Sequence, residues 1–227
     1  TAQPSLLLHK GNVYVDTHSG ALVEVNADTG NMNWGFQYEA DVPDTQNWWG
    51  YNQTQSLLTV APPIAIGDTL YFKGMRSQRL YALQLSGPKI LWQRPVAKSA
   101  MLMAIDGDRI LLTGEETESL RLANRELQWS SRVPVGTSMI RPAVTRNRVY
   151  QFTPRGIFEL DKAAGDVVRT FRGTDLGSLG GSVFLTPQAI VTVSNVAVTA
   201  YPIRSDKPAG QPTPQKSSDE EESEGGS

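Results

Sequence analysis

The stretch SGALVEVNADTGNMNW, residues 19–34, decides the fold of this chain. Its apolar, β-branched run at Leu22–Val25 lies between two glycine turns, and the stretch ends on Trp34. In the turn NADTG, the asparagine and aspartate side chains can bond nearby backbone amides, and the final glycine tolerates a positive φ. The stretch therefore predicts a strand, a tight turn and a second strand that carries a tryptophan.

A hairpin pattern of apolar residues, a polar turn and a second apolar strand recurs along the chain. It reads LLHKGNVYV, IAIGDTLYF, AIDGDRILL, VTRNRVYQF and, in weaker form, LTPQAIVTV, at residues 7–15, 64–72, 104–112, 144–152 and 185–193. The turn centres are 56, 40, 40 and 41 residues apart. A period near 40 residues with several strands per unit is typical of a β-propeller, in which each repeat forms one four-stranded blade.

We therefore predict an all-β propeller of four-stranded antiparallel blades over residues 1–203, with about four full blades and a partial fifth. A large flat indole on an outer strand suits the contact between neighbouring blades. Trp34, Trp92 and Trp129 are accordingly predicted to be buried at successive blade interfaces, and the fourth repeat has Arg169 at this position.

Two segments, GALVEVNADTGNMNW and RLYALQLSGPKILW, resemble the PQQ-like, or quinoprotein-type, propeller repeat, which is roughly G-x-L-x-A-x-D-x-x-T-G-x-x-x-W. The fourth repeat, RGIFELDKAAGDVVRTFRG, is similar to the C-terminal blades of bacterial proteins of this family. Glu24 and Glu159 depart from the repeat, which often has alanine there, whereas Ala82 follows it. The resemblance implies a ring commonly of eight blades, so we expect upstream blades of the same polypeptide to complete it. It also implies a periplasmic or cell-envelope location; the 227 residues contain no signal-peptide pattern.

The composition, with 39% hydrophobic and 19% charged residues, predicts a globular protein. Residues 205–227 hold six acids and two lysines, and subtracting this −4 from the −2 of the whole chain leaves +2 for residues 1–204. No basic stripe points to a nucleic-acid partner, and no apolar run is long enough for a membrane helix. The Pro-, Ser- and Gly-rich acidic segment at 204–227 is predicted to be disordered.

The first repeat interval is about 16 residues longer than the others, which predicts an insertion after the first blade. Its Trp48, Trp49 and Tyr51 could form an aromatic ligand platform at the propeller rim, or could instead fold back to cover the blade edge. The chain has two histidines, His9 and His18, and no cysteine, so we expect no metal site.

Two functions remain open from the sequence. The first is a non-catalytic propeller scaffold that presents loops to a protein partner or cell-envelope ligand, because the blade pattern is clear and no catalytic motif accompanies it. The second is a quinoprotein dehydrogenase that uses PQQ and calcium, with its catalytic blades outside this chain. The vicinal cysteine pair that such enzymes often carry is missing here. We therefore expect no enzymatic activity and no cofactor, PQQ included.

Overall fold

The structure is a computed structural model that describes residues 4–17, 19–40, 61–74, 77–97, 99–114, 116–131, 133, 142–153, 156–172, 182–186, 188–193 and 198–202. These residues form strands β1 to β19. None of them belongs to a helix long and apolar enough to cross a membrane.

Four strands make each of the first four blades, and three strands make the fifth. Blade 1 contains β1 (Ser5–His9), β2 (Asn12–Asp16), β3 (Ala21–Asn26) and β4 (Met32–Gln37). Blade 2 contains β5 (Ile64–Ile66), β6 (Thr69–Phe72), β7 (Arg79–Gln84) and β8 (Lys89–Pro95). Blade 3 contains β9 (Met101–Asp106), β10 (Arg109–Thr113), β11 (Thr117–Arg121) and β12 (Leu127–Ser131). Blade 4 contains β13 (Ala143–Val144), β14 (Arg148–Thr153), β15 (Gly156–Asp161) and β16 (Val167–Arg172). Blade 5 contains β17 (Ser182–Leu185), β18 (Ala189–Val193) and β19 (Val198–Pro202).

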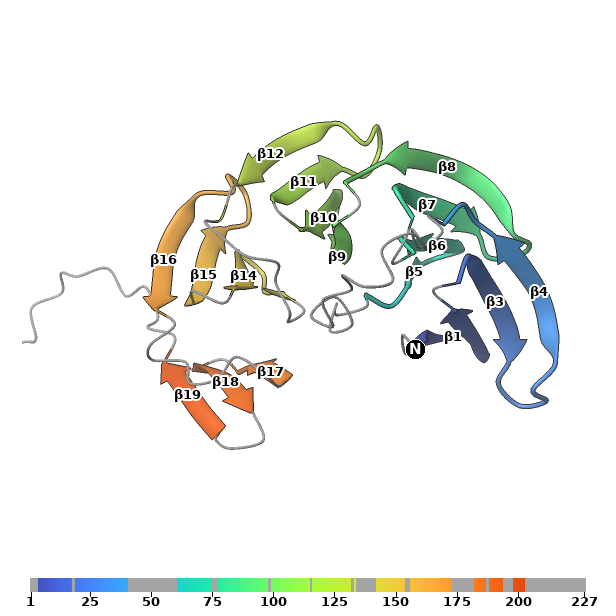
Figure 1. The fold of residues 1–227 in the computed structure, drawn as a ribbon, viewed down its shortest axis with the longest axis horizontal. Coiled ribbons are helices and arrows are strands. Elements are labelled where there is room, and N and C mark those ends of the chain that lie inside the picture. The colour runs from blue at the N-terminus through green and yellow to red at the C-terminus, as the bar shows by residue number, and fades with distance from the viewer. Residues whose placement is uncertain are drawn as a thin grey trace, which may run out of the picture.

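The blades follow one another around an arc (Figure 1). Within a blade, the strands are antiparallel and lie in chain order. Each full blade begins near the inside of the arc, and β4, β8, β12 and β16 run along its outer rim (Figure 1). The predicted propeller of four full blades and a partial fifth is thus confirmed, while the eight-bladed ring stays a prediction.

The local turns explain why this sequence folds into meanders. Lys10 and Gly11, at the first hairpin, both have positive φ, of 50° and 77°. This conformation matches the right-handed twist of the two strands that the turn joins. In the turn between β3 and β4, Asn26 Oδ1 accepts a hydrogen bond from the backbone amide of Thr29 at 2.9 Å, and Gly30 has a φ of 73°. The predicted roles of Asn26 and Gly30 are therefore confirmed, while the predicted bond from the Asp28 side chain stays a prediction.

The third and fourth strands shift register at the same place in all four full blades. In blade 1, Glu24 pairs with Trp34, and the next pair is Val25 with Met32, so the outer strand has one extra residue. Such a β-bulge re-aims the side chain beside it. The same shift precedes Trp92, Trp129 and Arg169.

Apolar side chains fill the spaces between blades. Tyr14 and Leu22 of blade 1 form one buried cluster with Leu70 and Phe72 of blade 2. Equivalent clusters join blades 2 and 3, blades 3 and 4, and blades 4 and 5. Blades 2, 3 and 4 therefore each bury both faces against their neighbours, and the core consists of one apolar cluster at each blade interface.

Candidate functional site between the blades

The three outer-strand tryptophans each pack against a core cluster that two successive blades share. Trp34 contacts the cluster shared by blades 1 and 2, Trp92 the cluster of blades 2 and 3, and Trp129 that of blades 3 and 4. Trp129 is 9% exposed, whereas Trp34 and Trp92 are half-buried. All three indoles therefore contact clusters that two successive blades share, but only Trp129 is buried as predicted, and Trp34 and Trp92 are less buried than predicted.

Trp129 packs against Gly165, in the turn between β15 and β16 of blade 4, where only a glycine fits. A Cβ on Gly165 would stand 2.5 Å from Cε3 of the indole, and the φ of Gly165 is 81°. The indole Nε1 donates a hydrogen bond to the carbonyl oxygen of Lys162 at 3.1 Å. We call this turn glycine, together with the carbonyl three residues before it, an indole seat.

In blade 3, the corresponding turn residue is Arg125, one of two described non-glycine residues with positive φ. Its guanidinium carbon lies 5.5 Å from the centroid of the Trp92 ring. Arg94, two residues after Trp92, donates from Nη1 to the carbonyl of Arg125. Trp92 therefore makes a cation–π contact with the turn residue of the next blade, whereas Trp129 packs on a turn glycine at the same place.

Blade 4 replaces the tryptophan by a charged group. Arg169 lies 2.9 Å from Oε2 of Glu159, and Nε of Arg148 lies 3.2 Å from Oε1 of the same carboxylate. Glu159 is 6% exposed, so two cations neutralise a buried anion. Arg169 also lies over the ring of Phe171, which contacts Tyr201 of blade 5. Arginine thus takes the place of the indole next to the last described interface.

Glu24, at the matching position of blade 1, has fewer hydrogen-bond and ion-pair partners than Glu159. It is 5% exposed, and Asn33 Nδ2 donates to its Oε1 at 3.1 Å. Its Oε2 and the Nε1 of the paired Trp34 have no hydrogen-bond partner among the described residues. A buried polar atom without a partner costs about 1–3 kcal/mol, so this position is a weak point of the first interface.

A buried tyrosine joins blades 1 and 2. The hydroxyl of Tyr38 donates to Asp16 Oδ1 at 2.6 Å, and its ring contacts Phe72 edge-on at a centroid distance of 5.4 Å. Gly74 makes room for the ring, since a Cβ there would stand 2.4 Å from Cε2 of Tyr38. Burial, and then the neighbouring Asp16 carboxylate, raise the pKa of Tyr38 well above its ordinary value. The hydroxyl therefore stays protonated and acts as a structural donor.

Polar contacts link the hairpin turns of neighbouring blades. Lys10 Nζ donates to Asp68 Oδ1 at 2.7 Å, and this contact lowers the pKa of Asp68. Arg109 Nη1 donates to the carbonyls of Lys162 and Ala163, at 3.0 and 3.2 Å. These contacts fix turns of blade 1 against blade 2 and turns of blade 3 against blade 4.

Several predicted features lie outside the described residues, namely Trp48, Trp49, Tyr51, His18 and the segment 204–227. His9 is half-buried, and its Nε2 lies 3.3 Å from the carbonyl oxygen of Gly67. Within the described ranges, no group of three or more His, Asp or Glu side chains could hold a metal ion. The contacts described above are packing, hydrogen-bond and ion-pair contacts that join one blade to the next.

Known proteins share this architecture. A protein-family model described as outer membrane protein assembly factor BamB matches residues 1–171. Among solved structures, BamB from Moraxella catarrhalis is similar, with a TM-score of 0.63 and 18% identity, over 89% of this chain and 58% of that chain. The computationally designed Ika8 protein is also similar, with a TM-score of 0.54 and 13% identity, over 88% of this chain and 70% of that one. No curated protein matches the sequence. These structures share the fold, and the chain spans 58% of the length of the Moraxella protein.

Proposed function

The chain belongs to the family of the outer membrane protein assembly factor BamB, and we propose that it is a non-catalytic propeller scaffold for protein partners in outer-membrane assembly. The family match over residues 1–171 carries this proposal, because it covers the first four blades. The proposal includes a location in the periplasm or at the cell envelope. It also includes upstream blades of the same polypeptide that complete the ring.

The packing between blades supports a scaffold role. The glycine seat at Gly165, the cation–π contact at Arg125 and the tyrosine joint at Tyr38 each fix one blade on the next. Binding loops need a rigid support if they are to hold one geometry. Blades locked in this way would keep their rim loops in constant relative positions for a partner.

Deletion of the gene in its own bacterium tests this function. We expect lower amounts of folded outer-membrane β-barrel proteins, measured by their heat-modifiable migration in gels, and recovery when the wild-type gene is restored. Cell fractionation should place the protein in the envelope. Unchanged levels of folded barrel proteins in the deletion strain would refute the assembly role.

The proposal also states that the protein holds no PQQ. Isothermal titration of the purified protein with PQQ, with and without calcium, should give no heat beyond dilution. Micromolar binding would instead favour a quinoprotein dehydrogenase.

Within this function, Trp48, Trp49 and Tyr51 are proposed to contact the partner. The double variant Trp48→Ala/Trp49→Ala should keep the wild-type melting temperature and fail to restore folded barrel proteins in the deletion strain. The matched control is Leu91→Ala, at an exposed apolar position on β8 of blade 2, because this blade already has described neighbours on both sides. A large loss of stability in the double variant would instead assign these indoles to blade covering.

A further inference from the structure

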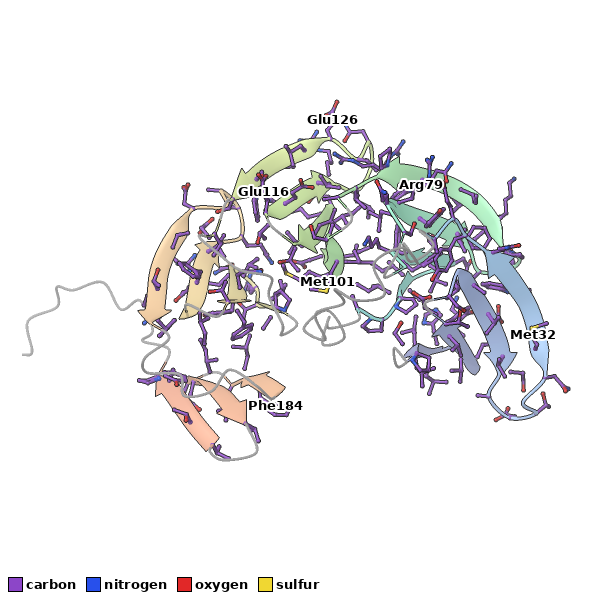
Figure 2. All side chains as sticks on the ribbon, in the orientation of Figure 1. Met32, Arg79, Met101, Glu116, Glu126 and Phe184 are labelled. Atoms are coloured by element: carbon purple, nitrogen blue, oxygen red, sulfur yellow. The ribbon has the colours of Figure 1, made fainter. Side chains whose placement is uncertain are left out.

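Two arginines lie together at the outer side of the interface between blades 2 and 3. Arg94 is on β8, two residues after Trp92, and its Nη1 donates to the backbone carbonyl of Arg125. Arg125 lies in the turn between β11 and β12, with its guanidinium carbon 5.5 Å from the centroid of the Trp92 ring. Figure 2 shows Glu126, the next residue, pointing away from the arc on its outer side. We call Arg94 and Arg125 the arginine pair.

The backbone at Arg125 has a conformation that arginine rarely adopts. Its φ is 63°, whereas blades 1 and 4 have Gly30 and Gly165 at this place in the turn, with φ of 73° and 81°. A partly exposed cation–π contact stabilises by no more than the left-handed conformation costs a residue with a Cβ. The contact with Trp92 therefore does not explain why this turn has an arginine. A strained residue that stability does not explain is a sign of function.

The arginine pair has unused hydrogen-bond donors and no counterion among the described residues. A guanidinium carries five N–H groups. Arg94 donates to the carbonyl of Arg125, and Arg125 Nη1 donates to the carbonyl of Ala123 at 2.6 Å, so both acceptors are neutral. Glu126 is exposed, and no ion pair joins it to a described cation. Two positive charges therefore lie close together on the rim without a described anion.

Blade 4 shows which group two such guanidiniums bind. Arg148 and Arg169 contact the two oxygens of the Glu159 carboxylate, at 3.2 and 2.9 Å. Carboxylates are the group that the fork of N–H donors on a guanidinium matches best. In blade 2, the residue at the position of Glu159 is Ala82. A carboxylate for the arginine pair therefore has to come from another part of the chain or from another molecule.

We propose that the acidic run of this chain, DEEESE at residues 219–224, binds the arginine pair through its carboxylates. The run contains five acids, and residues 205–227 carry a net charge of −4 against +2 for residues 1–204. The charges of the two partners are therefore opposite. The bound segment covers the outer rim between blades 2 and 3, and the contact does not depend on the proposed assembly role.

The acidic run is long enough and close enough in the chain to reach the arginine pair. β19 ends at Pro202, and 17 residues lead from there to Asp219. An extended chain of this length spans about 56 Å, whereas a compact domain of about 200 residues is about 40 Å across. Because the run and the arginine pair belong to one polypeptide, their effective concentration is in the millimolar range. The chain's own segment is therefore favoured over an acidic segment of a separate molecule.

Paramagnetic NMR on the full 227-residue chain tests the contact. The chain has no cysteine, so Ser223→Cys provides a single attachment point for a nitroxide label inside the acidic run. The label broadens the amide signals of residues near it. At low salt, the signals of residues 92–94 and 121–126 should lose most of their intensity. They should recover at an ionic strength of about 0.5 M, where the Debye length is about 4 Å.

The double variant Arg94→Gln/Arg125→Gly should abolish this broadening. Glycine relieves the positive φ, and glutamine keeps a donor for the carbonyl of residue 125, so the melting temperature should not fall. The matched control is Arg79→Gln/Lys10→Gln, which removes two positive charges that already have carboxylate partners. The control should leave the broadening of residues 92–94 and 121–126 unchanged.

Three outcomes would overturn the proposal. The first is the absence of broadening at residues 92–94 and 121–126 in the labelled chain, and the second is its persistence in the Arg94→Gln/Arg125→Gly variant. The third comes from a mixture in which the nitroxide is on one set of chains and the isotope label on another. Equal broadening in that mixture would assign the contact to a second copy of the chain, whereas the proposal expects none.

Discussion

Trp129 and Gly165 are in contact across two blades, and the indole occupies the space that a Cβ at residue 165 would need. Gly165→Ala should therefore destabilise the protein by about 2–4 kcal/mol, from the strain of a positive φ together with displacement of the ring. Gly107→Ala is the control, because its φ is also positive and its Cβ position is open. Urea unfolding measures both; equal losses would contradict the contact.

Trp129 and Trp34 differ in the hydrogen bonding of the indole Nε1. Nε1 of Trp129 donates to the carbonyl of Lys162, whereas Nε1 of Trp34 has no partner among the described residues. Replacement by phenylalanine removes similar volume at both positions. We expect Trp129→Phe to cost about 1 kcal/mol more than Trp34→Phe, because only the former breaks a hydrogen bond, although the carbonyl of Lys162 keeps the bond from Arg109 Nη1. Equal free energies of unfolding would show that the bond at Trp129 contributes nothing.

Glu24 and Glu159 hold the same position in their blades, yet removal should have opposite consequences. Glu159→Ala leaves Arg169 without its carboxylate and leaves Arg148 with Asp161 alone, and should destabilise by about 1–3 kcal/mol. Glu24→Ala removes a buried oxygen without a partner and recreates the residue that blade 2 has at Ala82, so stability should be unchanged or higher. Thermal unfolding of both variants decides this, and a severe loss in Glu24→Ala would be the contrary outcome.

The stability of blade 4 should depend on pH through Asp161. The backbone amide of Ala164, followed by that of Ala163 and the Arg148 guanidinium, lowers the pKa of Asp161 below its ordinary value. The unfolded carboxyl therefore binds its proton at a higher pH, near about 3.9, than the folded one does. Below that pH the unfolded state holds more protons, so stability falls as the pH decreases through the folded pKa. Asp161→Asn should flatten this fall below about pH 4 in urea unfolding; an unchanged slope would exclude this residue as its source.

The blades could be predicted from the sequence because the strands and turns of each repeat depend on residues that are close together in the chain. Turn glycines, β-branched runs and a 40-residue period are properties of neighbouring residues, so the first hairpin and NADTG could be read directly. The contacts between blades could not be predicted in the same way. Arg125 and Trp92 come from different blades and meet only through packing across an interface. The contacts of Tyr38 with Asp16 and Gly74 correspond to no position of the repeat pattern. The replacement of tryptophan by Arg169 was visible, but its pairing with Glu159 and Arg148 required the structure.

The register shift beside each outer-strand anchor has a consequence for solubility. β4, β8, β12 and β16 are the last strands of their sheets, so each presents an edge of backbone amides and carbonyls that a foreign strand could extend. An extra residue at Asn33, and at the same place in the next three blades, interrupts that edge and increases its local twist. A flat incoming strand would lose register at the interruption. The feature that aims the indole inward thus also protects four exposed edges from joining those of other molecules into aggregates.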